Sequence, residues 1–118
     1  MIWEIEYTEA FESWWQQLDS AELESVAVSI QLLEARGPAL PFPYSSAVVT
    51  SRFSHMRELR IQHKGVPIRV IYAFDPRRVA ILLIGGSKKG DKRWYKKFVP
   101  LADRLYAKHL ANLKQKGS

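Results

Sequence analysis

The segment with the clearest chemical character is a group of cations that follows a run of apolar residues. Six Lys and Arg side chains lie among residues 88–97, and Trp94 and Tyr95 stand between them. Cations bind phosphates and aromatic rings stack on bases, so the combination suits a polyanion with exposed bases. The alternative interpretation is a solvated basic loop that leads into a helix.

Two further cations join this group if the neighbouring segments are strands, as their residue patterns predict. The candidate catalytic residues are therefore Arg60, Arg69, Lys88, Lys89 and Tyr95. The cations could hold a phosphate and stabilise a pentacovalent phosphorane, a lysine among them could act as a base, and the tyrosine could stack on a base or move a proton. The candidate RNA-binding residues are Arg57, Lys92, Arg93, Lys96 and Lys97.

RNA carries its own nucleophile, the 2′-hydroxyl group. A nuclease that uses it needs alignment, charge stabilisation and proton transfer, but no metal. The sequence predicts no metal site and no cofactor, since it lacks His ligand spacing, paired carboxylates on the basic face and a GxxxxGK[ST] phosphate loop. A purely structural alternative remains for Arg60 and Arg69, namely salt bridges to Glu58 or Asp75.

Composition places the chain among folded globular proteins. Its 118 residues fit one domain spanning 1–118, and 47% of them are hydrophobic. The absence of cysteine excludes disulfides and thiolate sites. No apolar run approaches the ~20 residues of a membrane span, and the N-terminal segment does not resemble a signal peptide. We therefore expect a cytoplasmic protein with no membrane partner.

Charge is divided sharply along the chain. Residues 1–50 carry a net charge of −7, whereas residues 51–118 carry +13, which gives the total of +6. An even scatter would indicate solubility alone. This polarity instead predicts a basic working face and a separate acidic one.

The first half of the sequence predicts a strand and a helical hairpin. Residues 2–7 alternate between polar and apolar, as strands do. Thr8 is a predicted N-cap for a helix that ends near Leu18, and Asp19-Ser20 caps a second helix over 21–35, which Gly37-Pro38 terminates. Residues 37–55, with three prolines, are predicted to form a long loop.

The second half predicts three strands and a final helix. The strands cover 56–63, 67–74 and 79–84 and form an antiparallel meander, with Gly85 and Gly86 ending the third strand. The helix covers about 94–113. The predicted fold is α+β, of β-α-α-β-β-β-α order. Its mostly antiparallel four-stranded sheet packs on the hairpin and presents Arg60 and Arg69 on the opposite face.

Five runs of residues carry a family resemblance. They are MRELR (56–60), IRVIYAFDPRR (68–78), ILLIGG (81–86), DKRWY (91–95) and PLADRLY (100–106). They resemble the RelE/ParE superfamily of type II toxins, in its HigB or phage Gp49-like branch. The resemblance covers nearly the whole chain and implies the same RelE-like fold, with residues 56–106 as its specific part.

The resemblance implies a ribosome-dependent mRNA endoribonuclease, or mRNA interferase. Such toxins cut mRNA without metal and are neutralised by a cognate antitoxin, here expected to be a helix-turn-helix protein. By position, Arg69 matches the sheet arginine of the family, Lys88 or Lys89 the basic residue after the last strand, and Tyr95 the C-terminal tyrosine. The chain departs from the branch at residues 87–90, where a DKTG-like sequence is more usual, and in its longer last helix.

Two other functions are compatible with the sequence. A ParE-like toxin would share the fold but inhibit DNA gyrase, and its induction would signal DNA damage while mRNA stays intact. A non-catalytic basic module would bind RNA or the ribosome without cutting. The sequence leaves codon preference, oligomeric state and the antitoxin-binding surface open.

Overall fold

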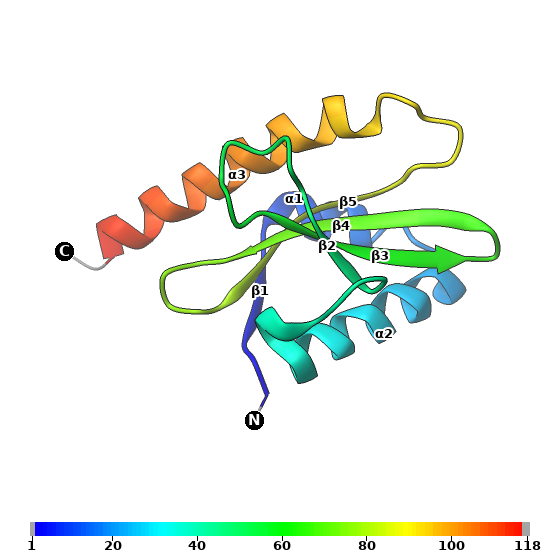
Figure 1. Ribbon diagram of the computed structural model, residues 1–118, viewed down its shortest axis with the longest axis horizontal. Coiled ribbons are helices and arrows are strands. Elements are labelled where there is room, and N and C mark those ends of the chain that lie inside the picture. Colours follow the sequence, from blue (N-terminus) through cyan, green and yellow to red (C-terminus); the bar gives the residue numbers. More distant parts are fainter. Residues whose placement is uncertain (1, 117–118) are drawn as a thin grey trace.

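A five-stranded sheet with helices on both faces forms the architecture of the protein, in a computed structural model that describes residues 2–116 (Figure 1). In chain order the elements are β1 (Ile5–Tyr7), α1 (Glu9–Trp15), α2 (Ser20–Arg36), the 3-10 helix η1 (Gly37–Ala39), β2 (Ser45–Ala47), β3 (Arg57–His63), β4 (Val66–Phe74), β5 (Ala80–Ser87) and α3 (Trp94–Lys116). The α+β class and the order of the predicted elements are confirmed.

The strands lie in the order β1-β5-β4-β3-β2. β1 is parallel to β5, and the other pairs are antiparallel, so the mostly antiparallel sheet is confirmed. The predicted strand number was one too low. β2 lies inside the predicted loop 37–55, and its three residues pair with Arg57–Leu59. A strand this short shows too little alternation to stand out in a segment rich in proline and serine.

The predicted helix starts are confirmed by their caps. The Thr8 hydroxyl accepts a hydrogen bond from the backbone N–H of Phe11, and Asp19 forms a capping box with Glu22. The helices α1 and α2 pack against one face of the sheet. The core there includes Leu59 and Val70, both fully buried.

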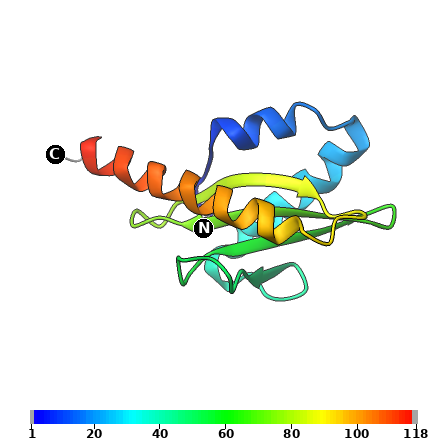
Figure 2. The same cartoon turned by 90° about the horizontal axis from the view of Figure 1, so that it is seen from above.

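The other face of the sheet is covered along much of its length by α3, which runs in roughly the same direction as the strands (Figure 2). Ile71 and Ala73 follow Arg69 on β4 at alternate positions, and both are fully buried in this second core. Only the end of this face beyond the start of α3 is therefore available for a site. Within residues 2–116, no helix combines the length and apolar content needed to cross a bilayer.

The two glycines of β5 have a different role from the predicted one. Gly85 and Gly86 do not end the strand, since β5 continues to Ser87. A Cβ on Gly85 would overlap the ring of Trp14, and one on Gly86 would lie 3.0 Å from Nε1 of Trp94. The glycines thus let aromatic rings approach the strand from both faces, and this approach fixes where α3 begins.

Candidate functional site

A buried carboxylate, Glu58 on β3, lies at the centre of the basic face. Only 4% of the residue is exposed. The Tyr95 hydroxyl lies 2.8 Å from Oε1 and 3.1 Å from Oε2 of Glu58, and the Ser46 hydroxyl donates to Oε2 at 2.9 Å. Burying a carboxylate is costly unless hydrogen-bond donors and a countercharge surround it. Its surroundings supply both.

The countercharges are the two arginines that the sequence singles out. Nη1 of Arg60 lies 3.6 Å from Glu58, and Nε of Arg69 lies 3.7 Å from it. The arginines are directly opposed in the register of β3 and β4. Like charges in such a pair repel, and the carboxylate between them offsets the repulsion. The salt bridges to Glu58 that were the structural alternative are present and help to build the site.

Arg69 is the more constrained of the two arginines. Only 6% of the residue is exposed, and its Nη1 donates a 3.1 Å hydrogen bond to the Ile68 carbonyl. Its buried Nε has no hydrogen-bond partner, because Glu58 at 3.7 Å is too far for one. Because this Nε is itself buried beside Glu58, an incoming anion could reach the guanidinium of Arg69 only through its small exposed part.

Lys88 and Tyr95 extend the cluster from the sheet toward solvent. Nζ of Lys88 lies 3.2 Å from the Tyr95 hydroxyl and 4.4 Å from the centre of its ring. The backbone N–H of Lys88 donates to the Pro67 carbonyl, which fixes the residue after β5. The structure thus brings together four of the five candidate catalytic residues, and they share Glu58 or Tyr95 as a neighbour.

The start of α3 determines where Tyr95 lies. Trp94 is 1% exposed, and its ring stacks on that of Phe98 with 4.6 Å between ring centroids. The ring of Trp94 thus packs beneath the last helix and is not available to stack on a base. Tyr95, the next residue, is half-buried and meets the Trp94 ring edge-on at 5.1 Å. Aromatic packing therefore holds the hydroxyl of Tyr95 against β3.

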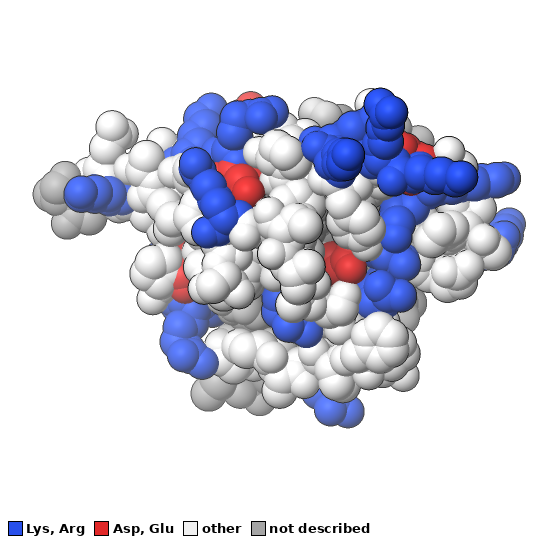
Figure 3. Space-filling view, turned by 45° about the horizontal axis from the view of Figure 1, so that its top comes forward, with Lys and Arg blue, Asp and Glu red and all other residues white. Residues whose placement is uncertain are grey.

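The remaining predicted residues lie outside this cluster. Lys and Arg side chains gather over the segment between β5 and α3 and over the start of α3 (Figure 3). Lys97 forms a 3.1 Å ion pair with Asp91, whose pKa is lowered mainly by the hydrogen bond from Lys97. Arg57 is on the opposite face of the sheet, where its Nε donates to the Ser45 hydroxyl. Among the predicted site residues, the exposed cations are Lys89, Lys92, Arg93, Lys96 and Lys97.

Glu58 and Ser46 were not among the site residues predicted from the sequence. Strand alternation places Glu58 on the same face as Arg60, and that was the available signal. A carboxylate between arginines looked like an ordinary salt-bridge partner. Ser46 could not be found, because β2 itself was missed.

The cluster contains the groups needed for proton transfer and charge stabilisation. A hydrogen-bonded chain runs from the Lys88 ammonium through the Tyr95 hydroxyl to the Glu58 carboxylate. Arg60 and Arg69 flank that carboxylate and could bind a phosphate. Across residues 2–116, no group of three or more His, Cys, Asp or Glu side chains is arranged to hold a metal ion.

A second ionic network fastens the opposite end of α3. The Asp75 carboxylate accepts hydrogen bonds from Arg77 and lies 2.9 Å from Nε2 of His109 on α3. Burial acts to raise the pKa of Asp75, but the hydrogen bonds from His109, Arg77 and the Val79 backbone outweigh it and lower the pKa. Arg77 also binds Glu6 through two hydrogen bonds, the chief cause of the lowered pKa of Glu6. This network is structural.

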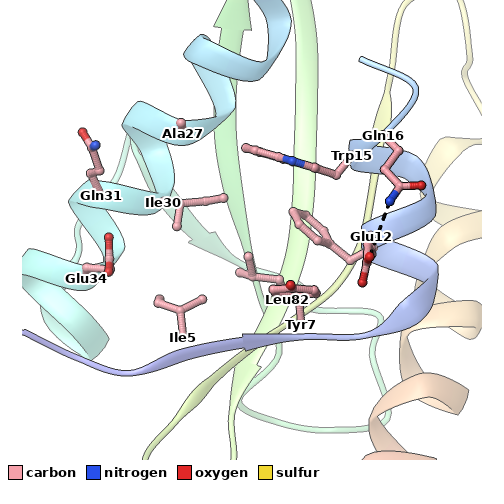
Figure 4. A pocket seen from close by; sticks show the side chains of 11 residues that line it. Ile5, Tyr7, Glu12, Trp15, Gln16, Ala27, Ile30, Gln31, Glu34 and Leu82 are labelled. Carbon is pink, nitrogen blue, oxygen red and sulfur yellow. Dashed lines mark hydrogen bonds between the residues drawn. The ribbon is translucent and has the colours of Figure 1, made fainter. Parts of the chain in front are cut away.

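A groove lies away from the basic cluster. It has a volume of about 620 Å³ and lies between α1, α2 and the edge of the sheet (Figure 4). Its floor is apolar, with Ile5, Ile30 and Leu82, and Glu12 and Glu34 lie at its rim. An apolar groove with carboxylates is unsuited to a polyanion, so the cluster around Glu58 is the better candidate site.

The chain is similar in sequence to known proteins. The family described as "Phage derived protein Gp49-like" matches residues 13–107. Two Mycobacterium tuberculosis (strain ATCC 25618 / H37Rv) relatives are similar. "Putative toxin HigB3" is 44% identical over 102 residues, covering 86% of this chain and 88% of the relative. "Putative toxin HigB2" is 40% identical over 105 residues, covering 87% of this chain but 52% of the relative.

Two solved structures share the fold. One is a double mutant of the E. coli toxin RelE in the free state, with a TM-score of 0.56 and 12% identity over 80% of this chain and 92% of that one. The other is the RelE–RelB complex from Pyrococcus horikoshii OT3, with a TM-score of 0.56 and 15% identity over 76% of this chain and 99% of that one. At such identities the likeness shows the fold alone.

Proposed function

The chain belongs to the phage-derived Gp49-like family, in the HigB branch of the RelE superfamily of toxins, and from that premise we propose that it is a ribosome-dependent endoribonuclease that cleaves translated mRNA. The observation that supports this proposal is the series of hydrogen bonds from Lys88 through Tyr95 to Glu58, which lies between Arg60 and Arg69. It combines a proton acceptor, a proton donor and phosphate-binding cations at one end of the sheet.

The proposed reaction uses the 2′-hydroxyl of RNA as nucleophile. Glu58 is almost fully buried, whereas Tyr95 is half-buried and can meet the substrate. The 2′-hydroxyl passes its proton to the Tyr95 oxygen while Tyr95 passes its own to Glu58. The 2′-oxygen then bonds to phosphorus, the bond from phosphorus to the 5′-oxygen breaks, and the Lys88 ammonium protonates that oxygen.

Charge stabilisation is the role of the two arginines in this scheme. The phosphorane carries more negative charge than the bound RNA, and Arg60 and Arg69 lie where that charge develops. The products are a 2′,3′-cyclic phosphate and a 5′-hydroxyl. The exposed cations, Lys89 among them, hold the RNA and the ribosome through phosphate contacts.

Two partners follow from the proposal. Ribosomes presenting mRNA are the first. The second is a cognate antitoxin, which we expect to be a helix-turn-helix protein. The Pyrococcus relative of this fold was solved with RelB. Charge complementarity favours the basic face as the antitoxin surface, and the acidic groove between α1 and α2 is the alternative.

The test is cleavage of a defined mRNA on purified translating ribosomes, with mapping of the new ends. Lys88→Gln removes the proposed proton donor beside Tyr95, while Lys89→Gln removes an exposed neighbouring cation and is the matched control. We expect Lys88→Gln to slow cleavage by about 10²–10⁴-fold and Lys89→Gln to weaken binding at raised salt with little change in the chemical step.

Four results would count against the proposal. Growth arrest without new mRNA ends would exclude mRNA cleavage, and DNA damage signalling with intact mRNA would favour gyrase inhibition. Equal rates for Lys88→Gln and Lys89→Gln would remove Lys88 from the reaction. A 2′-deoxy nucleotide at the cut site that is still cleaved would exclude the 2′-hydroxyl as nucleophile.

A further inference from the structure

Two aromatic rings lie exposed beside the basic cluster, on the segment that leads into β2. Phe42 is 68% exposed and Tyr44 is 50% exposed. Leaving large rings in water forgoes the stabilisation that their burial would give. Exposed aromatic side chains next to a basic patch are typical of surfaces that stack nucleic-acid bases.

Arg60 connects these rings to the candidate catalytic cluster. Its guanidinium carbon lies 5.1 Å from the centre of the Phe42 ring, and its Nη1 lies 3.6 Å from Glu58. The distance to Phe42 is within the range of a cation–π contact. The ring therefore directly contacts the arginine that would neutralise the scissile phosphate.

The backbone of Tyr44 is fixed beside the same arginine. Ser45 pairs with Leu59, so Tyr44 lies next to Arg60 at the edge of the sheet, and its carbonyl accepts the Arg60 backbone N–H at 2.9 Å. Ser45 is fully buried, with its hydroxyl 2.6 Å from that of Tyr72, whereas Tyr44 is half exposed.

The segment that carries the rings is held at both ends. Leu40 before it is 3% exposed, and Ser45 after it is fully buried. The backbone N–H groups of Tyr44 and Ser45 both donate to the Pro41 carbonyl, at 3.0 and 3.1 Å. An ordered segment presents its rings with little further loss of conformational entropy when a ligand binds.

We propose that Phe42 and Tyr44 form a stacking site for an unpaired RNA base next to the phosphate held by Arg60 and Arg69. The inference deepens the proposed function, because it names where an adjacent nucleotide of the substrate binds. Arg60 and the nearby lysines favour a polyanion over an apolar protein surface, and a stacked base uses the ring faces that a phosphate cannot. A protein partner on the same rings is the competing explanation.

The test measures binding of short single-stranded oligonucleotides to the full chain by fluorescence anisotropy at fixed salt. The oligonucleotides are 2′-O-methylated, so the nucleophile is blocked, and a second set has one abasic site at each position in turn. Phe42→Ala and Tyr44→Ala remove the rings, and Phe42→Trp keeps one. Val49→Ala is the matched control, since Val49 is 89% exposed. Urea unfolding checks that each variant is folded.

We expect Phe42→Ala and Tyr44→Ala each to raise Kd by about 5- to 30-fold, equivalent to about 1–2 kcal/mol. The loss should vanish for the oligonucleotide that lacks the stacked base. Phe42→Trp and Val49→Ala should bind as the parent does.

Several outcomes would overturn the inference. These are no measurable binding by the parent chain, equal binding by Phe42→Ala and Val49→Ala, or an equal loss for intact and all abasic oligonucleotides. A loss of antitoxin binding with RNA binding unchanged would assign the rings to a protein interface instead. The binding measurement does not depend on cleavage. If the protein binds bases through Phe42 but cuts no mRNA, the proposed function is refuted and the stacking site stands.

Discussion

The hydroxyl of Tyr95 lies 2.8 Å from the carboxylate of Glu58, a residue 37 positions earlier in the chain. This hydrogen bond joins the first turn of α3 to β3. Because Lys88 also contacts Tyr95, the contact organises groups from β3, from α3 and from the segment between β5 and α3. The candidate site therefore depends on how α3 is placed.

Tyr95→Phe should separate the hydroxyl from the ring. The ring can still pack on Trp94, but the link between Lys88 and Glu58 is lost. We expect the single-turnover rate of mRNA cleavage on ribosomes to fall by about 10²–10⁴-fold, the usual contribution of a proton-transfer group. Tyr7→Phe, at an exposed tyrosine in the groove between α1 and α2, is the control. An unchanged rate for Tyr95→Phe would remove the hydroxyl from the mechanism.

Glu58→Gln should lower stability as well as activity. The substitution leaves the buried guanidinium of Arg69 without its countercharge. Breaking a buried ion pair from one side costs about 3–5 kcal/mol, and we expect a loss near the lower end of that range because the atoms are 3.7 Å apart. Urea unfolding measures it, with the exposed Glu24→Gln as control.

A second variant tests the cause of that loss. Glu58→Gln combined with Arg69→Gln removes both charges and should recover part of the free energy of unfolding. The free energy of unfolding is also measured for Arg69→Gln alone. If the losses of the two single variants simply add in the double variant, the two side chains are not coupled.

The order of elements could be predicted from the sequence because each has a strong local signal. Thr8 and Asp19 are N-cap residues that predict the helix starts, and the alternation of polar and apolar residues in 56–63 and 67–74 predicts two strands. The same alternation put Arg60 and Arg69 on one face. The register that sets them opposite each other, however, depends on a turn whose geometry the sequence does not specify.

The features that could not be predicted depend on contacts between distant segments. Glu58 becomes the centre of the site only because Ser46 and Tyr95 reach it from β2 and α3. Gly85 and Gly86 looked like a strand end, since glycine usually interrupts strands. Their actual role follows from tryptophans that lie elsewhere in the sequence.

Acidification should weaken the network around Asp75. Its pKa is lowered in the folded state, since hydrogen bonds from His109, Arg77 and the backbone outweigh the effect of burial. A lowered pKa stabilises the fold fully at pH values above the unfolded pKa of about 4, and this contribution is lost as pH falls through the folded pKa. Urea unfolding from pH 7 to pH 3 measures the decline.

Asp75→Asn provides the comparison for this pH dependence. The variant should be less stable than the parent at pH 7, and the difference should shrink as pH falls below about 4, where the parent loses the charge as well. Parallel stability curves for parent and Asp75→Asn across the whole range would show that Asp75 does not carry this pH dependence.

Gly86→Ala should disturb catalysis through the start of α3. The new Cβ would lie 3.0 Å from Nε1 of Trp94 and 3.2 Å from the Phe98 ring. Both rings must then shift by a few tenths of an ångström, at a cost of about 1–3 kcal/mol for overpacking. Tyr95 follows Trp94 directly, so its hydroxyl moves with them and its hydrogen bond to Glu58 weakens.

Gly85→Ala distinguishes this route from general destabilisation. Its Cβ would overlap the Trp14 ring, on the face covered by α1 and α2, and away from Tyr95. We expect Gly85→Ala to unfold at a lower urea concentration than Gly86→Ala, yet to keep a higher cleavage rate per folded molecule. If the two variants instead lose activity in proportion to their loss of stability, the position of α3 does not control the site. Loss of packing on either face of the sheet would then lower activity equally.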